Sequence, residues 1–345
     1  MKKFLPQKDD LSRLINQQAA DLLHRLKNLP VEELGLPHHV LEYFKSSHYK
    51  RLYFSIETSA HLLYRSITIR DKRAQDIVIM DYGAGVGTLY MLAKMIGCKQ
   101  VIYNDHLDDW KTSAQLIATA LGIQVDEYVV GDVEYTLQYL QQKQISCDII
   151  TSRNVIEHIY KLDLFFGYIG KYQPEAIVYS STTANYYNPA SNIKHILWHR
   201  KWEKIFVKQR MVIIRKRVPS FSEKEIATLG KATRGLAMDE LKEAIENYKM
   251  AKVLPDPWKH HTNTCDPANG VWFEHLLTFK EYRNFIDQAQ YNIQFEPGFW
   301  DTHNISSWKN IIGKVLNPVI RIVGSVGILF APFIYVIVVP RKRSS

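Results

Sequence analysis

The middle of the chain alternates between short apolar runs and longer amphipathic stretches. The apolar runs are rich in β-branched and aromatic residues and end at glycine or polar residues, as buried strands do. The stretches between them have the length of helices. We expect strands at residues 77–81, 100–104, 127–130, 147–152 and 176–180, and helices at about 87–96, 109–121, 134–142 and 161–171. Because strands separated by helices usually pair in parallel, this pattern predicts an α/β domain.

The pattern changes on both sides of this alternation. Leucine and isoleucine recur at helical spacing in residues 11–29, and a second helical stretch is expected at about 38–67. After Thr182 the alternation stops in a basic, aromatic and histidine-rich segment, and it resumes with a helix at about 278–288 and a strand at about 291–296. We therefore expect an N-terminal helical cap that closes a pocket, a core, a substrate-side insertion after strand five and the remainder of the core sheet, at residues 1–75, 76–182, 183–275 and 276–345.

The C-terminal region contains eighteen uncharged residues, Ile322–Val339, which is the lower limit for a membrane-spanning helix. Pro332 divides this run, and the β-branched and aromatic half that follows suits a buried strand. We expect a final strand at 333–339, preceded by an apolar helix at about 308–329. Peripheral membrane attachment through that helix, and a true membrane span, remain alternatives.

Composition narrows the classes of protein. Hydrophobic residues make up 46% of the 345 residues, which supports a packed core rather than a disordered chain. The net charge of +9 is compatible with anionic substrates, a membrane surface or nucleic acid, and selects none of them. Cys98, Cys147 and Cys265 are far apart, which argues against a disulfide framework and a zinc site. The first ten residues lack the apolar region of a signal peptide, so we expect a cytoplasmic protein.

A glycine-rich turn joins the first expected strand to its helix. The residues are Asp81-Tyr82-Gly83-Ala84-Gly85-Val86-Gly87. A strand, a tight turn and a helix bring backbone N–H groups to a bound nucleotide, and glycine removes Cβ atoms where a ligand approaches the main chain. The order Asp-x-Gly-x-Gly-x-Gly differs from the Gly-x-Gly-x-x-Gly of dinucleotide-binding turns.

Polar residues follow the next three expected strands. Asn104 and Asp105 follow strand two, Gly131 and Asp132 follow strand three, and a polar cluster at 154–158 follows strand four. Because the carboxyl ends of parallel strands meet at one edge of a sheet, these side chains are expected around one crevice. An acid after strand two can accept hydrogen bonds from ribose hydroxyls, and one after strand three can hold the amine of an adenine. Each acid alone is also a suitable helix N-cap.

These motifs together resemble the class I S-adenosylmethionine-dependent methyltransferases, most of all the branch that methylates small molecules, quinones and glycan or lipid intermediates. The resemblance covers residues 81–87, 104–105, 131–132 and 148–158. It implies a Rossmann-like, seven-stranded, mostly parallel sheet with helices on both faces, whose last strand is antiparallel and lies at the chain end. It implies that the turn follows the methionine part of the cofactor, that Asp105 holds the ribose and that Asp132 holds the adenine. The cofactor-binding residues implied are Asp81, Gly83, Ala84, Gly85, Gly87, Asn104, Asp105, Asp132, Val133 and Asn154.

Catalytic residues are less defined by the sequence, because positioning supplies much of the rate of methyl transfer. A general base is needed for a hydroxyl acceptor, and His158 is the candidate by location. Glu157 could hold the acceptor hydroxyl or cap a helix. The resemblance includes quinone O-methyltransferases with a metal-binding Glu-x-x-Glu-His cluster, but Asn154 replaces the first acid, so no metal is expected.

The acceptor side of the pocket is expected in the insertion. His195 and His199 share a helical face and could line it, or could lie on a basic surface. The polar and aromatic segment 260–275 is a second candidate for the acceptor site. We expect O-methylation of a small-molecule, glycan or lipid-linked acceptor, with carbon and nitrogen acceptors as alternatives.

Alternatives from other classes stay open. An NAD-dependent oxidoreductase would require glycine at position 88, where Thr88 stands. A catalytically silent cofactor-binding or interaction protein would carry the same motifs. A nucleic-acid methyltransferase is less favoured, although the basic segment 200–217 keeps it open.

Overall fold

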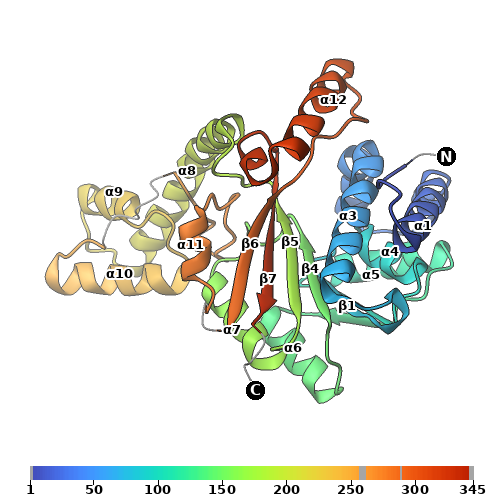
Figure 1. Ribbon diagram of the computed structural model, residues 1–345. Coiled ribbons are helices and arrows are strands. Elements are labelled where there is room, and N and C mark those ends of the chain that lie inside the picture. The colour runs from blue at the N-terminus through green and yellow to red at the C-terminus, as the bar shows by residue number, and fades with distance from the viewer. Residues whose placement is uncertain (1–2, 256–261, 288–289, 342–345) are drawn as a thin grey trace.

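The computed structural model describes residues 3–255, 262–287 and 290–341, and contains one sheet with helices on both faces (Figure 1). Each expected strand is present, with both ends within two residues of the predicted ones. The strands are β1 (Val78–Tyr82), β2 (Gln100–Asp105), β3 (Glu127–Val130), β4 (Ile149–Arg153), β5 (Ile177–Thr182), β6 (Tyr291–Pro297) and β7 (Ile334–Pro340).

The strand order is β3-β2-β1-β4-β5-β7-β6. Strands β1 to β5 pair in parallel, and β7 is antiparallel to both of its neighbours. The winding reverses between the adjacent strands β1 and β4, where open α/β sheets form a ligand crevice at their carboxyl edge. This is the sheet of the class I methyltransferase fold, so the predicted fold class is confirmed.

Helices cover the sheet in two layers that follow the alternation of side chains along the strands. Ile79 and Tyr103 pack with α1, α3, α4 and α5, whereas Met80 and Ile102 face α6, α7 and α11. The α-helices are α1 (Asp10–Lys27), α2 (His38–Tyr43), α3 (Leu52–Arg70), α4 (Leu89–Met95), α5 (Asp108–Ala120), α6 (Val133–Gln142), α7 (Leu162–Tyr172), α8 (Pro189–Arg217), α9 (Glu223–Ala232), α10 (Met238–Ala251), α11 (Phe279–Asn284) and α12 (Ser307–Ile322). Short helical turns add η1 (Val31–Leu34), η2 (Phe44–His48), η3 (Tyr49–Arg51), η4 (Ala74–Asp76) and η5 (Gly324–Leu329).

The N-terminal cap differs from the continuous helix expected at 38–67. The π-helical turn η2 and the 3₁₀ turn η3 separate α2 from α3. The buried positions Val40, Phe44, His48 and Leu52 recur every four residues, which exceeds the 3.6 residues of an α-helical turn. A wider π turn keeps His48 on the inner side of the cap, which explains the interruption.

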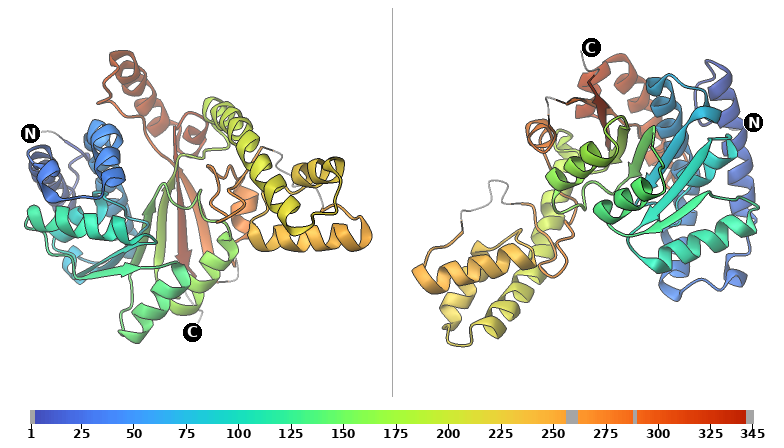
Figure 2. Two further views of the ribbon diagram at one scale, coloured as in Figure 1. Left: turned by 180° about the vertical axis from the view of Figure 1, so that it is seen from behind. Right: turned by 90° about the horizontal axis from the view of Figure 1, so that it is seen from below.

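The segment after β5 is mostly helical and extends away from the sheet. Helices α8, α9 and α10 enclose a small core of their own, which includes Ile214, Leu229 and Leu241. Figures 1 and 2 show that this part projects from the side of the molecule that carries β6, away from the N-terminal helices.

The C-terminal apolar stretch divides into a helix and a strand, as predicted. Helix α12 and the 3₁₀ turn η5 precede β7, which pairs with both β5 and β6. Within the described ranges, no helix is both long enough and apolar enough to cross a membrane. The helix expected at 278–288 is shorter, because α11 ends at Asn284, and residue 288 lies outside the described residues.

Candidate active site

The glycine turn after β1 is shaped by the packing of the chain on itself. Gly83 and Gly85 have φ angles of +67° and +53°, in the left-handed region that favours glycine. A Cβ atom on Gly83 would lie 2.7 Å from Cγ2 of Val155, and one on Gly87 would lie 2.8 Å from the carbonyl oxygen of Ala84. Contacts with Val155 and within the turn therefore require glycine at positions 83 and 87. This requirement holds whether or not a ligand binds.

Asp105 is buried at the end of β2 and fixes this turn. Its Oδ2 accepts a hydrogen bond of 3.0 Å from the backbone N–H of Gly85, and its Oδ1 accepts one of 3.2 Å from Leu107. An ionised carboxylate has about four acceptor positions, so lone pairs remain for a ligand. The exposed His106 lies 3.3 Å from Oδ1, and the hydrogen bond to Asp105 raises the pKa of His106.

Asn104 and Asp132 have structural roles in this structure. The buried Nδ2 of Asn104 donates to the carbonyl oxygen of Gly131 at 3.1 Å and to Oγ1 of Thr136 at 2.8 Å, which joins β2 to the start of α6. Asp132 is the exposed N-cap of α6, with Oδ1 accepting from the N–H of Tyr135 at 2.9 Å. The helix-cap role that the sequence allowed for Asp132 is therefore present, and its second oxygen is left for solvent or a ligand. The half-buried Val133 begins α6.

Asp81 and Arg153 border the inner side of the glycine turn. Oδ2 of Asp81 accepts from the N–H of Tyr90 at 3.1 Å, and burial raises the pKa of Asp81 to about 7 against the opposing charge of Arg153. Arg153 donates from Nη1 to the carbonyl oxygen of Ser55 at 3.1 Å and to its Oγ at 2.5 Å. A cationic side chain thus lies between the turn and the N-terminal cap.

The cap packs directly beside the glycine turn. Oγ1 of Thr88, which begins the helix after the turn, lies 3.1 Å from Oγ of Ser55 and 2.9 Å from Oγ of Ser59. All three residues are buried. Trp110 of α5 lies 3.7 Å from where a Cβ of Gly85 would be, and its ring makes an edge contact of 5.2 Å with that of Tyr43. Contacts of the cap with α4 and α5 therefore hold it over the turn.

A cavity of about 300 Å³ lies between the cap and the carboxyl ends of β4 and β5. Asn154, which directly follows β4 with φ of +57°, borders it, and its N–H donates to the carbonyl oxygen of Ser181 at 2.8 Å. The lining comes from α2, η2, η3, α3 and the strand ends: Tyr43, Ser47, His48, Arg51, Phe54, Ser55, Thr58, Arg153, Asn154, Ser181, Thr183 and Phe333.

His48 is a lining residue that the sequence reasoning missed. It is buried, and its Nε2 has no hydrogen-bond partner. Burial, assisted by the charge of Arg153, lowers the pKa of His48 to about 3, so the imidazole is neutral and can accept a hydrogen bond. The four-residue spacing of buried positions, in which His48 alone is titratable, is the signal that could have identified it.

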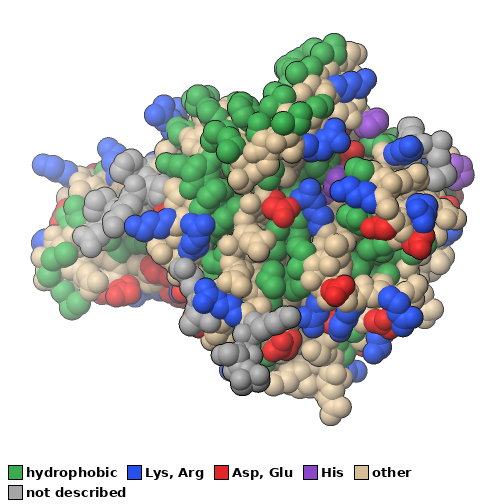
Figure 3. Space-filling model, viewed as in Figure 1, with side chains coloured by type: hydrophobic (Ala, Val, Ile, Leu, Met, Phe, Trp, Pro, Cys, Tyr) green, Lys and Arg blue, Asp and Glu red, His purple; other side chains and the backbone are tan. Residues whose placement is uncertain are grey.

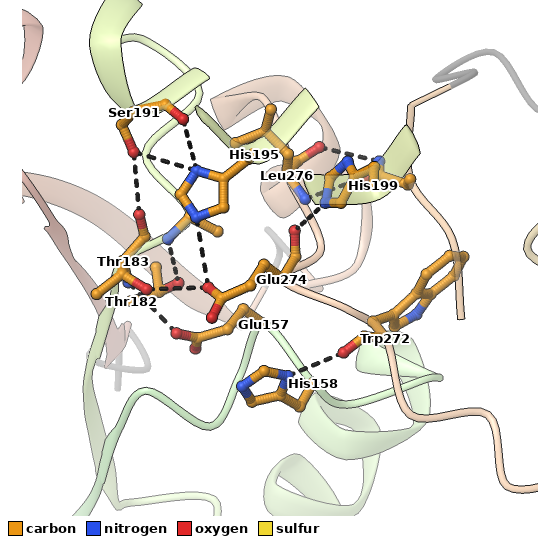
Figure 4. Close-up of polar contacts among 12 residues, drawn as sticks. Glu157, His158, Thr182, Thr183, Ser191, His195, His199, Trp272, Glu274 and Leu276 are labelled. Atoms are coloured by element: carbon orange, nitrogen blue, oxygen red, sulfur yellow. Dashed lines mark hydrogen bonds and ion pairs between the residues drawn. The ribbon is translucent and has the colours of Figure 1, made fainter. Parts of the chain in front are cut away.

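The two predicted catalytic residues, Glu157 and His158, are not among the residues that line this cavity, and Figure 4 shows the contacts they make instead. Nδ1 of His158 lies 2.9 Å from the carbonyl oxygen of Trp272. Glu157 is fully buried; Oε1 accepts from the N–H of Thr183 at 3.3 Å, Oε2 has no partner, and burial raises the pKa of Glu157 to about 7. Thr183 also donates from Oγ1 to Oε2 of Glu274 at 2.9 Å. Because Thr183 borders the cavity, it connects the cavity to both carboxyl groups.

The insertion contributes less to the cavity lining than its sequence suggested. His195 and His199 are buried in α8, where Nε2 of His195 lies 3.5 Å from Oε2 of Glu274 and Nε2 of His199 lies 3.0 Å from the carbonyl oxygen of Glu274. Neither histidine borders the 300 Å³ cavity, and neither does any described residue of the segment 260–275. Residues 260 and 261 of that segment lie outside the described residues.

Metal ligation was not expected at this site. No group of three or more His, Cys, Asp or Glu side chains that could hold a metal ion occurs among the residues with described positions. The metal-independent reaction stays a prediction.

Comparisons with known proteins give fold-level likenesses. No family profile matches the chain, and no curated protein matches it. Solved structures that it resembles include a ribosomal protein L11 methylase from Lactobacillus delbrueckii subsp. bulgaricus, with 18% identity over 37% of this chain and 60% of that chain and a TM-score of 0.29. A SAM-dependent methyltransferase from Agrobacterium tumefaciens shares 14% identity over 37% and 44% of the two chains, with a TM-score of 0.30.

TrmN from Thermus thermophilus shares 17% identity over 36% of this chain and 38% of that chain, with a TM-score of 0.29. In each of these three comparisons the match spans less than two thirds of the solved chain. Similarities this distant carry no argument about function, and the fold assignment rests on the order and direction of the strands.

Proposed function

We propose that this protein is an S-adenosylmethionine-dependent methyltransferase that transfers a methyl group to an oxygen of a small-molecule, glycan or lipid-linked acceptor. The observation that carries the proposal is the position of Asp105. Its buried carboxylate is bonded to the N–H of Gly85 at the carboxyl edge of a sheet with this strand order. A ribose bound there would contact the carboxylate of Asp105, which can accept its hydrogen bonds, and the glycine turn that this carboxylate holds in place.

The residues around the turn fit such a cofactor. Asp105 would accept hydrogen bonds from the ribose hydroxyls, and the exposed oxygen of Asp132 would accept one from the adenine amine. Arg153, beside the turn, would hold the carboxylate of the methionine part through charge-assisted hydrogen bonds. The bound cofactor would supply a methyl group on a sulfonium, which is an activated carbon.

The acceptor is assigned to the cavity of about 300 Å³ beside Arg153. Phe54 and Phe333 exclude water from its far side, and the neutral imidazole of His48 accepts a hydrogen bond from the acceptor hydroxyl. Thr183 connects the cavity to the carboxyl groups of Glu157 and Glu274. The contributions assigned to this chain are orientation of the hydroxyl, exclusion of competing water, and transfer of the released hydroxyl proton to Nε2 of His48 and from there to solvent.

Calorimetric titration with S-adenosylmethionine tests the cofactor assignment. Asp105→Asn keeps the size of the side chain and removes its charge, so the affinity should fall on the order of a hundred-fold, because hydrogen bonds to charged groups contribute about 1.5–3 kcal/mol each. Asp126→Asn is the matched control, since Asp126 also accepts from a backbone N–H, that of Val101 at 2.8 Å, at the opposite edge of the sheet.

Competition and turnover separate the alternatives. Binding of NAD in preference to S-adenosylmethionine would favour an oxidoreductase. Turnover is tested by incubating cell extracts with the protein and S-adenosylmethionine, and mass spectrometry detects products that gain about 14 mass units (the transferred methyl less a proton). Cofactor binding without any such product would favour a silent binding protein.

A further inference from the structure

Helix α12 presents an apolar face to the outside of the molecule. Residues 305–330 contain eleven of the twenty-six exposed large hydrophobic residues of the described chain. We call these eleven residues the α12 surface. They are Ile305, Trp308, Ile311, Ile312, Val315, Val319, Ile322, Val323, Val326, Leu329 and Phe330. The exposed fraction reaches 83% at Ile322, which is unusual for a residue flanked by other exposed apolar side chains.

The orientation of α12 is fixed by its polar side. Oδ1 of Asn317 accepts from the N–H of Trp300 at 2.7 Å, and its Nδ2 donates to the carbonyl oxygen of Trp300 at 2.9 Å. Gly313 and Ile320 are buried on the same side of the helix. Trp308, Ile312, Val315, Val319 and Ile322 recur at helical spacing on the opposite side, so the amphipathic helix is anchored with its apolar face outward.

A second apolar group lies close by on α8. Ile193, Leu197 and Trp198 are exposed on the first part of that helix. Asn188, the N-cap of α8, donates to the carbonyl oxygen of Ala331 at 3.0 Å, which places the start of α8 beside the end of η5. Figure 3 shows hydrophobic side chains gathered across the top of the molecule, over α12 and the neighbouring end of α8.

The charged side chains of α12 itself are all positive. Residues 302–341 contain no Asp or Glu, and Lys309, Lys314 and Arg321 are exposed along α12. Lys194 lies over the ring of Trp198, with Nζ 4.1 Å from the ring centroid. This combination of apolar side chains and lysine or arginine suits the headgroup region of an anionic bilayer, and it disfavours a second copy of the same cationic surface.

A second cavity borders the same helix. It has a volume of about 630 Å³, and Ile320 and Arg321 line it from α12. Glu57 and Arg65 of α3 line its inner side, and Oε2 of Glu57 is buried without a hydrogen-bond partner. The lining thus offers a polar ligand both charged and unsatisfied groups.

An aromatic wall separates this cavity from the proposed acceptor cavity. Phe299 lines the larger one, and its ring centroid lies 5.7 Å from that of Phe54 and 5.3 Å from that of Phe333, both of which line the smaller one. The large cavity therefore lies between the α12 surface and the acceptor cavity and adjoins both.

We propose that the α12 surface binds an anionic lipid bilayer, and that the large cavity beside it receives the polar headgroup of a membrane-borne methyl acceptor. The second part rests on the proposed methyltransferase function, whereas the first is independent of it. In this arrangement α12 lies in the interface with its apolar face among the acyl chains, and Lys309, Lys314 and Arg321 contact the lipid phosphates.

Co-sedimentation of the full chain with vesicles tests the docking. The protein should bind phosphatidylcholine vesicles that contain phosphatidylglycerol more tightly than vesicles of phosphatidylcholine alone, and salt at about 1 M, where the Debye length is about 3 Å, should reduce the difference. Ile311→Asp combined with Val315→Asp should lower the binding on the order of ten-fold or more. Met250→Asp is the matched control, because Met250 is 77% exposed on α10, and its binding should equal that of the wild type.

Three outcomes overturn the docking. The first is absence of vesicle binding by the wild type, and the second is a loss of vesicle binding in Met250→Asp equal to that of the double variant. The third is a dimer in sedimentation velocity that Ile311→Asp with Val315→Asp dissociates, because a second copy would then cover this surface. S-adenosylmethionine affinity is measured on the same variants and should be unchanged. Failure of the wild type to bind S-adenosylmethionine would refute the proposed function and leave the docking result intact.

A separate measurement tests whether the methyl acceptor is a membrane lipid. Methyl groups from labelled S-adenosylmethionine should appear in the lipid fraction of a cell extract, and the docking variant should lose this incorporation when the lipid is in vesicles but retain it in detergent micelles. Label confined to the aqueous fraction would overturn this part of the proposal.

Discussion

The glycine turn permits a test in which backbone strain and steric collision are separated. Gly83 and Gly35 have nearly the same positive φ angle, +67° and +68°. Alanine at either position should lower the free energy of unfolding by about 1–2 kcal/mol, because it disfavours the left-handed conformation. A Cβ on Gly35 meets no atom within 4 Å, whereas one on Gly83 lies 2.7 and 2.8 Å from the two γ-methyl groups of Val155. Overpacking of this kind costs about a further 1–3 kcal/mol.

Gly83→Ala should therefore lower the free energy of unfolding by about 2–5 kcal/mol and Gly35→Ala by about 1–2 kcal/mol. Urea denaturation followed by circular dichroism measures both. A second measurement, the affinity for S-adenosylmethionine, should fall only for Gly83→Ala, because the displaced Val155 moves the turn. Equal losses of stability in the two variants would refute the steric argument, and Val155→Ala in the Gly83→Ala background should restore part of the loss if the argument is correct.

Three other changes have definite expected results. Thr88→Val leaves the buried hydroxyl of Ser59 without one partner and should cost about 1–3 kcal/mol in urea denaturation, with no loss expected for Thr88→Ser. Burial raises the pKa of Glu157 to about 7, so unfolding releases its proton; stability should fall by about 3 kcal/mol as the pH rises from about 4 to about 7, and Glu157→Gln should remove this part of the pH dependence. His48→Phe should lower kcat on the order of ten-fold with unchanged S-adenosylmethionine affinity; an unchanged kcat would exclude the proposed hydrogen bond.

The core fold was predictable because its signals are local. Each strand is a short apolar run between turn residues, and even β7 is marked by its β-branched composition. The sequence indicated a helical face at His195 and His199 but not the extent of α8, because its pattern of polarity is misleading: the residues it buries include His195, His199 and Arg210. These side chains are satisfied by partners distant in sequence, such as the carbonyl oxygens of Gly230 and Glu274, and no spacing rule reveals such partners.

Residues of the candidate site could be placed from the sequence only where their position depends on neighbouring residues in the chain. The sequence placed Asp105 beside the glycine turn, where the structure has it, because that position depends on one turn and the strand before it. Its role in holding a ribose stays a prediction. The sequence reasoning missed His48 and Ser55, because they reach the site only when the cap folds over the sheet. His158 was selected for its place after β4, but the chain turns sharply there, with Asn154 at φ of +57°, and directs His158 towards the carbonyl oxygen of Trp272.

The two cavities share one helix, which leads to a prediction about acceptor selectivity. Helix α3 contributes Phe54 to the smaller cavity and Glu57 to the larger one, whereas the insertion contributes only Thr183 to the described lining of the two. An acceptor that reaches the methyl donor from the larger cavity must pass the ring of Phe54. Phe54→Leu replaces that ring by a smaller apolar side chain and should widen the range of acceptors that are methylated.

The matched control for Phe54→Leu is Phe221→Leu, which makes the same change in the core of the insertion. Methylation of a panel of hydroxylated compounds of increasing size compares the two variants. If selectivity resides in α3, the ratio of kcat/KM for large to small acceptors rises for Phe54→Leu and stays at the wild-type value for Phe221→Leu. The reverse result would mean that the insertion selects the acceptor, as its histidine-rich and aromatic sequence first suggested.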